Sequence, residues 1–283
     1  MKISEPYGVG LVTHIKPEET IRLSELFKRV QFENFEFLLE IGSVYVDEKR
    51  VYTDIEVQPD SLVRVHRNPK RHPIQNIDWH SLIVENNDDF VVIDKPYGVP
   101  THPTVDNSRE NVLFQLSQVL NHELLITHRL DAETTGLLLF AKNKKFQNVF
   151  NYLISNKMVQ KKYKALTLNR PQEKKYIHYI KPDKFVPKLV SEEPIEGWQV
   201  CELIVERVND VTLPNGKSGY ESVIELVTGR THQIRAQFTG INCPLFGDSL
   251  YGDDENADYP MGLRSFYLKF NWTNQNKEFT FQV

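Results

Sequence analysis

Apolar and polar residues follow two different rhythms along the chain, and these rhythms predict its helices and strands. Residues 22–42 carry apolar side chains three or four positions apart, which is the spacing of an amphipathic helix. Residues 43–51 and 61–67 alternate between apolar and polar, and predict short strands joined by a turn. Residues 67–80 include two prolines and several polar residues, so we expect a linker there and a domain boundary near residue 70.

Beyond this linker, the pattern predicts more strands than helices. Helical spacing is found in residues 108–120, 145–159 and 230–240, and Ser108 is the expected N-cap of the first of these helices. Strands are expected within the segments 89–100, 135–142, 161–168, 198–208, 220–229 and 264–272. This balance predicts an α+β fold in which a large mixed sheet carries a few packed helices.

The overall composition is that of an ordinary globular protein, but the charges are unevenly distributed. Of the 283 residues, 40% are hydrophobic and 25% are charged, and the formal net charge is -4. Residues 1–60 hold seven Lys and Arg against twelve Asp and Glu, whereas residues 141–175 hold ten against one acid. A local excess of positive charge favours a polyanionic partner, although a solvated basic surface has the same composition.

Cysteine usage and hydropathy indicate where the protein works. Cys201 and Cys243 form no C-x-x-C pair, and two such cysteines fit a reducing compartment. The first 20 residues lack the basic start and apolar run of a secretory signal. No apolar run approaches the roughly 20 residues that a membrane helix needs. We therefore expect a cytoplasmic protein that does not enter a membrane. We also expect it to be a monomer.

The sequence HRLD, residues 128–131, lies directly before a buried strand and contains the first candidate for chemistry. Asp131 can hydrogen-bond the backbone of the following turn or the hydroxyls of Thr134 and Thr135, which would make it a structural residue. It can equally be a reactive carboxylate. The residues alone leave both interpretations open.

Two further segments bring polar side chains to strand ends. Tyr163 alternates with lysines at the start of a strand, so it is either a half-buried strand residue or an aromatic face on which a base stacks. The lysines that would bind phosphates beside it are Lys161, Lys162 and Lys164. A strand-to-helix junction after Gly229 can bind an anion or simply form a surface cap. Its cationic side chains are Arg230, His232 and Arg235.

Five segments, taken in order, resemble the RluA family of pseudouridine synthases over roughly residues 80–255. They are DFVVIDKPYGVPTHP, HRLDAETTGLLLFAK, KKYKAL, LVTGRTHQIRAQ and CPLFGDSLYG. Two departures are visible: Thr135 stands where the family usually has Ser, and GLRSFYLKF stands where Leu-His-Ala usually precedes the last strand. The resemblance implies a large mixed, mainly antiparallel sheet with flanking helices, occupying residues 71–283.

Residues 22–66 more faintly resemble the alpha-L RNA-binding domain of the ribosomal S-four type. This resemblance implies that residues 1–70 form a small RNA-binding domain. Acids stand where such domains usually show arginines, at Glu33, Glu36 and Glu40. We expect the fold to be kept and its affinity for RNA to be reduced.

The RluA resemblance implies an isomerase that converts uridine in RNA to pseudouridine. Asp131 would be the nucleophile, acting on the sugar or on the uracil ring. Arg230 matches the family arginine that pairs with this Asp, with Arg235 as the alternative. Tyr163 would stack on the base and help to remove the C5 proton late in the reaction.

The same resemblance implies how RNA is bound. Arg129 would fill the space that the flipped base leaves, while His128 is structural and Leu130 points into the core. Other expected RNA contacts are Lys161, Lys162, Lys164, His232 and Arg235. Ribosomal RNA is the first expected substrate and transfer RNA the second. The reaction neither oxidises nor hydrolyses, so no cofactor or metal is expected, and the sequence has no Walker A, G-x-G-x-x-G or His/Cys ligand pattern.

Two other classes of function are weighed against the synthase. The first is a non-catalytic RNA-binding or chaperone protein with the same fold, but the presence of Asp131, Tyr163 and Arg230 argues against a loss of activity. The second is a glycosidase that uses Asp131 and Glu133. Glycosidases usually take their two acids from separate elements, and they need a placed water.

Overall fold

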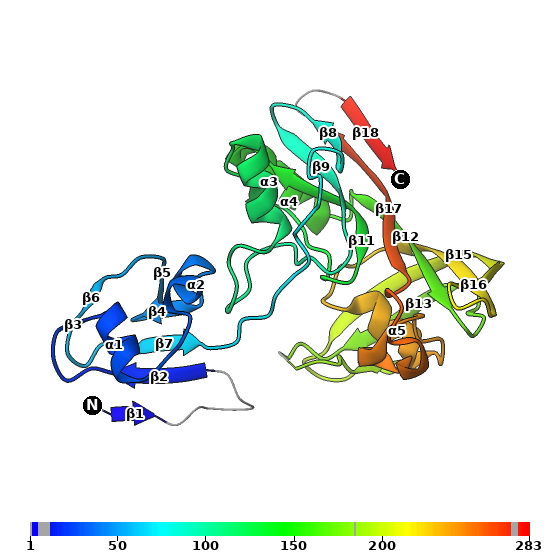
Figure 1. Ribbon diagram of the computed structural model, residues 1–283. Helices are drawn as coiled ribbons and strands as arrows, with labels where there is room; N and C mark the ends of the chain where they lie inside the picture. Colours follow the sequence, from blue (N-terminus) through cyan, green and yellow to red (C-terminus); the bar gives the residue numbers. More distant parts are fainter. Residues whose placement is uncertain (1, 5–11, 184, 273–276) are drawn as a thin grey trace. The chain divides into compact units, whose positions relative to one another are not determined.

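The computed structural model describes residues 2–4, 12–183, 185–272 and 277–283, and divides the chain between two units (Figure 1). Unit 1 comprises residues Met1–Ile77 and Val99–Asn121, and unit 2 comprises Asp78–Gly98 and His122–Val283. The chain therefore passes between the units three times, whereas the sequence predicts one boundary near residue 70. Part of the N-terminal stretch that bears on a secretory signal lies outside the described residues.

Unit 1 is built on a small sheet, and its first segment adds two short helices. Its five strands lie in the order β1 (Lys2–Ser4), β2 (Val12–Lys16), β7 (Val63–His66), β4 (Val44–Val46) and β5 (Lys49–Val51). A second pair joins β3 (Ile21–Arg22) to β6 (Glu56–Val57). The core is apolar and is formed by Ile15, Ile21, Leu23, Leu26, Phe27, Leu38, Leu39, Val44, Val57, Val63 and Val65. The expected strands at 43–51 and 61–67 are confirmed.

The helical stretch expected over residues 22–42 is two helices in the structure, α1 (Leu23–Arg29) and α2 (Phe35–Glu40). Between them Gln31 and Asn34 have left-handed backbone angles, with φ of 56° and 60°. A non-glycine residue in this conformation ends a right-handed helix. The apolar spacing of the sequence thus identifies the helical faces but not the break between them.

The second segment of unit 1 is fastened to the first by hydrogen bonds. The Ser43 hydroxyl donates to the Asp106 carbonyl at 2.6 Å, and the Tyr45 hydroxyl donates to the Val105 carbonyl at 2.7 Å. The Ser108 amide donates to the Ile41 carbonyl at 2.8 Å. These bonds join residues about sixty positions apart, which is why the sequence pattern does not predict this grouping.

Helix α3 (Val112–Leu120) ends this second segment, and its N-cap differs from the one expected. The side chain of Asn111 accepts a hydrogen bond from the Phe114 amide at 2.9 Å, so Asn111 is the N-cap. Ser108, the expected cap, lies three residues earlier, where its side chain donates to the Ile41 carbonyl. The predicted cap is thus wrong by three residues, because Ser108 bonds a distant carbonyl instead of the first turn of the helix.

Unit 2 is built on an eleven-stranded sheet (Figure 1). Its main path runs through β14 (Val190–Ser191), β13 (Lys175–Ile180), β15 (Gln199–Thr212), β16 (Ser218–Leu226), β12 (Gln160–Thr167), β17 (Leu263–Trp272), β11 (Thr135–Ala141), β9 (Phe90–Lys95) and β8 (Ile83–Asn86). Two further strands join it, β10 (Leu125–Ile126) beside β11 and β18 (Lys277–Gln282) beside β17. Strands β11 and β17 run parallel, and the other described pairs are antiparallel. The expected large, mixed, mainly antiparallel sheet is confirmed.

Helices α4 (Lys144–Ser155) and α5 (Gln233–Gly240) accompany this sheet, with two 3₁₀ turns, η1 (Ser249–Tyr251) and η2 (Asp254–Asn256). Phe146 and Phe150 of α4 stack at 5.6 Å between ring centroids, in a core that also contains Phe90, Phe270 and Trp272. Among the described residues, no helix is both long and apolar enough to cross a bilayer.

Gly136 marks the close approach of the parallel strands β11 and β17. It has φ of +103°, and a Cβ added there would lie 2.0 Å from the carbonyl oxygen of Ser265. A side chain would both strain the backbone and push β17 away. The strand that follows the HRLD loop is therefore fixed against its neighbour by a glycine.

We predict that Gly136→Ala lowers the free energy of unfolding by about 4 kcal/mol, because strain and overpacking add. Gly216→Ala is the matched control: Gly216 also has a positive φ, of +81°, but nothing lies within 4 Å of its added Cβ. It should cost only about 1 kcal/mol. Equilibrium urea unfolding measures both, and equal losses would contradict a steric role for Gly136.

Candidate active site

The HRLD loop joins β10 to β11 and is held in place by hydrogen bonds from other parts of unit 2. The carbonyl of Ala132 accepts two of them, from Lys95 Nζ at 2.9 Å and from the Gly98 amide at 2.8 Å. At the other end, the Nε2 atom of His128 accepts from the Leu139 amide at 3.1 Å. The loop carries Asp131 between these anchors, so its backbone position is well determined.

The carboxylate of Asp131 faces an arginine and a histidine, and burial lowers the pKa of that histidine, His232. Its Oδ2 atom lies 3.7 Å from His232 Nε2 and 3.9 Å from Arg235 Nη1. Arg235 is itself fixed by Asp248, to which it donates two hydrogen bonds of 2.7 Å, and its side chain is only 3% exposed. A bidentate pair of this kind sets the orientation of the guanidinium. Arg235 therefore presents a fixed positive charge to Asp131.

The pairing expected for Arg230 is made by the alternative, Arg235. Arg230 is exposed, and its Nε donates to the Val200 carbonyl at 3.4 Å. The helix α5 begins only at Gln233, so Arg230 lies in the loop ahead of it, while Arg235 lies on the buried side of its first turn. The register of this helix decides which arginine reaches the carboxylate.

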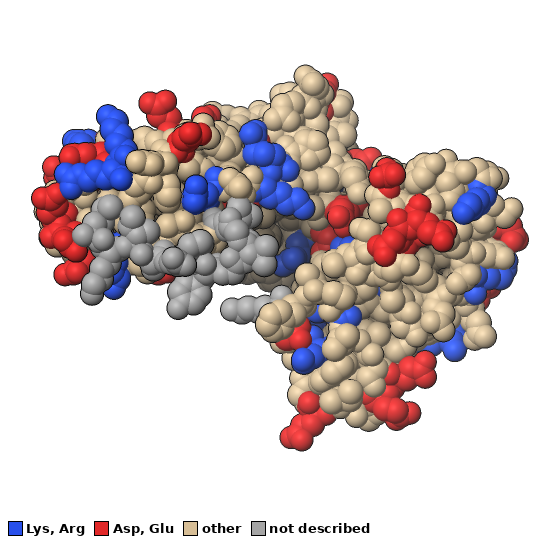
Figure 2. Space-filling view, turned by 60° about the horizontal axis from the view of Figure 1, so that its bottom comes forward, with Lys and Arg blue, Asp and Glu red and all other residues tan. Residues whose placement is uncertain are grey.

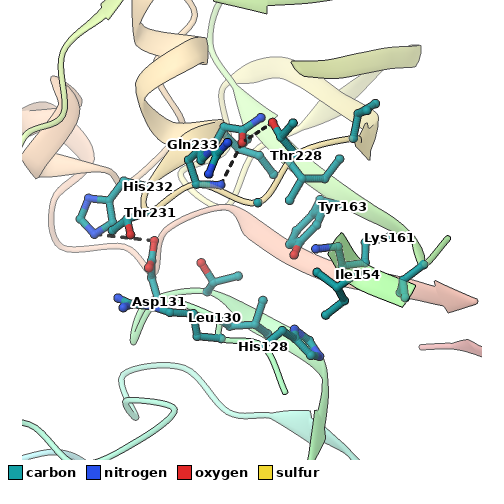
Figure 3. A pocket seen from close by; sticks show the side chains of 18 of the residues that line it. His128, Leu130, Asp131, Ile154, Lys161, Tyr163, Thr228, Thr231, His232 and Gln233 are labelled. Carbon is teal, nitrogen blue, oxygen red and sulfur yellow. Dashed lines mark hydrogen bonds and ion pairs between the residues drawn. The ribbon is translucent and has the colours of Figure 1, made fainter. Parts of the chain in front are cut away.

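Tyr163 and Lys161 of β12 line a cavity of about 470 Å³ together with Asp131 and His232 (Figure 3). Tyr163 is 5% exposed, and burial raises the pKa of its phenol, as the charge of Asp131 also does, while a hydrogen bond with Ser265 lowers it. The phenol is therefore neutral at physiological pH.

Of the three lysines expected to bind phosphates beside Tyr163, Lys161 lines this cavity, whereas Lys162 and Lys164 do not. Lys162 Nζ lies 2.7 Å from Glu206, and Lys164 Nζ lies 3.6 Å from Glu221. Side chains alternate between the two faces of a strand, so neighbours of Tyr163 point away from it.

Charged side chains also surround the cavity. Lys157 belongs to its lining, and Lys157 and Lys175 both pair with Glu202, at 3.8 and 3.1 Å. Arg129 is exposed at the edge of the catalytic loop. Acidic and basic side chains are interspersed over the face seen in Figure 2, although residues 1–60 hold more acids than bases.

Two basic groups near the HRLD loop, Lys95 and His128, have lowered pKa values. Burial lowers the pKa of Lys95 to about 7, although the charges of Asp131 and Glu133 oppose the shift. Burial, together with the charge of Lys161, lowers the pKa of His128 to about 3. His128 is thus neutral, and because Nε2 accepts a hydrogen bond, its proton is on Nδ1.

Sequence reasoning missed Lys95 and Asp248. Lys95 ends a strand that is almost wholly apolar, and a lysine in that setting could have been recognised as a buried cation with a structural task. Asp248 lies in a loop rich in Gly and Pro, where an acid is ordinary, so the sequence carries no signal for its pairing. Among the described residues, no group of three or more His, Cys, Asp or Glu side chains is placed to hold a metal ion.

Comparison with known proteins identifies the family to which this fold belongs. A family model described as RNA pseudouridylate synthase matches residues 89–239, more than half of the chain. The chain belongs to this family, and the resemblance to the RluA type is confirmed. The expected alpha-L identity of the N-terminal unit stays a prediction.

Individual relatives give the extent of the similarity. The chain is 36% identical over 219 residues to RNA pseudouridine synthase 6, chloroplastic, of Arabidopsis thaliana, covering 71% of this chain and 46% of that protein. It is 28% identical over 281 residues to the ribosomal large subunit pseudouridine synthase D of Buchnera aphidicola, covering 89% and 81%. The chain spans about half the length of the chloroplastic relatives it matches.

A solved structure supports the fold. Human RNA Pseudouridylate Synthase Domain Containing 4 matches with a TM-score of 0.58 and 24% sequence identity, covering 72% of this chain and 88% of that one. At this identity the match shows a shared fold.

We predict that His128 makes the protein sensitive to mild acid. Its folded pKa of about 3 lies below the ordinary value of 6.5, so the unfolded chain binds the proton first as pH falls. The contribution of neutral His128 to the free energy of unfolding is therefore fully present above pH 6.5 and is lost as the pH falls below it. The slope of this loss approaches about 1.4 kcal/mol per pH unit. His128→Gln, whose Oε1 can accept from the Leu139 amide, should flatten urea-measured stability between pH 6.5 and 5. An unchanged slope in this variant would show that His128 titrates normally.

Proposed function

We propose that this protein isomerises uridine to pseudouridine in RNA, with Asp131 as the nucleophile. The observation that carries the proposal is a single cavity in which Asp131, the buried Arg235 and Tyr163 meet, each on a segment that matches the family. In this reaction the C1′–N1 bond breaks, the uracil turns, a C1′–C5 bond forms and the C5 proton leaves. Electrons are conserved, so the side chains themselves can supply the chemistry.

Asp131 must be ionised to act as a nucleophile. Arg235 Nη1 lies 3.9 Å from its Oδ2 atom and places a positive charge beside the oxygen that would react, while His232 Nε2 lies 3.7 Å away. Arg235 can do this without moving, because Asp248 fixes it from the other side. A fixed charge of this kind needs no reorganisation during the reaction.

Tyr163 provides a face on which the flipped base stacks and a hydroxyl near the reacting ring. Its neutral phenol is suited to stacking and to hydrogen bonding. Once C5 has bonded to the sugar, its proton lies next to a carbonyl and is acidic, and the hydroxyl of Tyr163 is the candidate group for its removal.

RNA binding would rest on the side chains around the cavity mouth. Arg129, exposed beside Asp131, would occupy the space that the flipped base leaves in the stack. His232 and Lys161 line the cavity, and we keep them as RNA contacts. Lys162 and Lys164 lie outside the cavity and pair with glutamates, and their expected phosphate contacts stay a prediction.

Large-subunit ribosomal RNA is the first substrate we propose, and transfer RNA the second. The Buchnera relative carries a ribosomal name, and it matches nearly the whole chain. Cytoplasmic location and a monomeric state stay predictions, since other relatives are named as chloroplastic. Pseudouridine mapping in total RNA from a strain without this gene, with the complemented strain beside it, identifies the substrate.

Asp131→Asn should abolish pseudouridine formation while leaving the fold and RNA affinity nearly intact, because it removes the charge and keeps the shape. Glu133→Gln is the control, since Glu133 is 45% exposed and also contacts Arg235. We expect it to retain activity within tenfold of wild type. Product counts from RNA incubated with each variant decide this. Equal loss in both would favour a glycosidase that uses two carboxylates, and release of free uracil would support that function.

Tyr163→Phe keeps the stacking face and Tyr163→Ala removes it, so the pair separates the two roles of this residue. If the ring stacks on the base, RNA affinity should fall mainly in the Ala variant, by about 1–3 kcal/mol. If the hydroxyl removes the C5 proton, the Phe variant should bind normally but stall after base cleavage. Filter binding and single-turnover assays measure these effects, and wild-type behaviour of both variants would make Tyr163 a core residue only.

A further inference from the structure

Lys161 differs from its lysine neighbours because it has no carboxylate partner in the described part of the chain. Lys162 pairs with Glu206 and Lys164 with Glu221 on adjacent strands. Lys157 and Lys175 share Glu202. Lys161 lines the candidate active-site cavity instead, and no described acid forms an ion pair with it. A partly buried ammonium without a counter-charge is costly, and such groups persist where they serve a ligand.

The position of Lys161 within the cavity is well defined. Lys161 and Tyr163 are two residues apart on β12, and both side chains point into the cavity (Figure 3). In this view Asp131 and His232 lie on one side of the Tyr163 ring and Lys161 lies on the other. Its Nζ is beside Gly229, where an added Cβ would be 3.4 Å away.

A uridine bound with its sugar at Asp131 would reach across the Tyr163 ring toward Lys161 in one orientation. With the anomeric carbon at Asp131 and the ring stacked on Tyr163, the atom of uracil farthest from the sugar is the C4 carbonyl oxygen. This oxygen lies opposite N1 across the ring, so it points away from Asp131 and toward the side of the cavity that holds Lys161.

We propose that Lys161 donates a hydrogen bond to the C4 carbonyl oxygen of the target uracil and stabilises the negative charge of the departing base. This inference rests on the proposed function. When the C1′–N1 bond breaks, its electron pair stays with the uracil and spreads from N1 onto the carbonyl oxygens. Lys161 keeps its proton, and the charge returns to carbon when the C1′–C5 bond forms. Its task is that of an oxyanion-stabilising donor.

A phosphate group is the other anion that a lysine could hold, and the surroundings favour the base. Phosphates bind where several donors are exposed, as at the cavity mouth with Arg129, Arg230 and Lys157. Lys161 is partly buried beside the Tyr163 ring, and burial lowers its pKa. A donor at the far edge of the base also selects uracil over cytosine, which has an amino group at that position.

The test compares Lys161→Met, Lys161→Arg and the control Lys269→Met, which removes a lysine that pairs with Glu278 on β17 and β18. Single-turnover rates are measured on transcripts of large-subunit ribosomal RNA and transfer RNA. We expect Lys161→Met to slow the reaction by roughly 10²-fold, Lys161→Arg to recover part of this rate, and Lys269→Met to react like wild type. The thermal midpoint of Lys161→Met should equal or exceed that of wild type, because an unpaired buried charge is removed.

Transcripts made with 4-thiouridine in place of uridine test the contact itself. Sulfur is a poor hydrogen-bond acceptor, so the rate of wild type should fall on this RNA. The rate of Lys161→Met, which has already lost the donor, should fall little further. With 2-thiouridine, the two enzymes should be affected equally. If the rate losses from Lys161→Met and from 4-thiouridine are additive, Lys161 does not contact the C4 oxygen. RNA affinity measured over a series of salt concentrations tests whether Lys161 binds a phosphate instead. In that case Lys161→Met should bind RNA more weakly than wild type, with a salt slope smaller by about 0.9.

Two results distinguish this inference from the proposed function. If wild type is active and Lys161→Met reacts within threefold of its rate, the role of Lys161 is wrong but the proposed synthase function stands. A wild type that forms no pseudouridine in either RNA would overturn both.

Discussion

The positive charge of the buried Arg235 guanidinium requires nearby negative charges. Much of the active site consists of the carboxylates that supply them. A guanidinium that is 3% exposed needs counter-charges, and it meets three carboxylates, Asp131, Glu133 and Asp248. Asp248, which has no exposed side-chain surface, takes the two strongest bonds and fixes the plane of the group. The remaining guanidinium nitrogen, Nη1, faces the candidate nucleophile at 3.9 Å. Helix α5, the loop before β11 and the loop after Phe246 are therefore tied together through one side chain.

Much of this site could be predicted from the sequence, because its residues occur in short segments with distinctive composition. The segments identify Asp131 and Tyr163, and the alternation of apolar residues identifies the large sheet. The choice between Arg230 and Arg235 could not be made in this way. It depends on His232, whose backbone is left-handed with φ of 55° and ends the loop just before α5. Such a conformation is set by the packing around it and leaves little trace in the residue types.

Two other differences remain, of which the first is local and the second depends on contacts between distant residues. Strand periodicity implies that Lys162 and Lys164 face away from Tyr163, yet a cluster of charges in the sequence suggested one common surface. The segment Val99–Asn121 looks like part of the second unit because it follows β9 in the chain. Hydrogen bonds from Ser43 and Tyr45 place it in the first unit, and no local pattern encodes them.

The interleaving of the two units has a consequence for how such a protein can evolve. Residues Val99–Asn121 complete the N-terminal unit, but they are encoded between β9 and the HRLD loop of the other unit. A single genetic crossover near residue 70 would bring in a new N-terminal unit without the loop and helix that its predecessor used. Recombination would then leave two mismatched halves of one folding unit. Exchange of this unit between relatives thus requires two matched segments to be inherited together, which favours gradual divergence over domain shuffling.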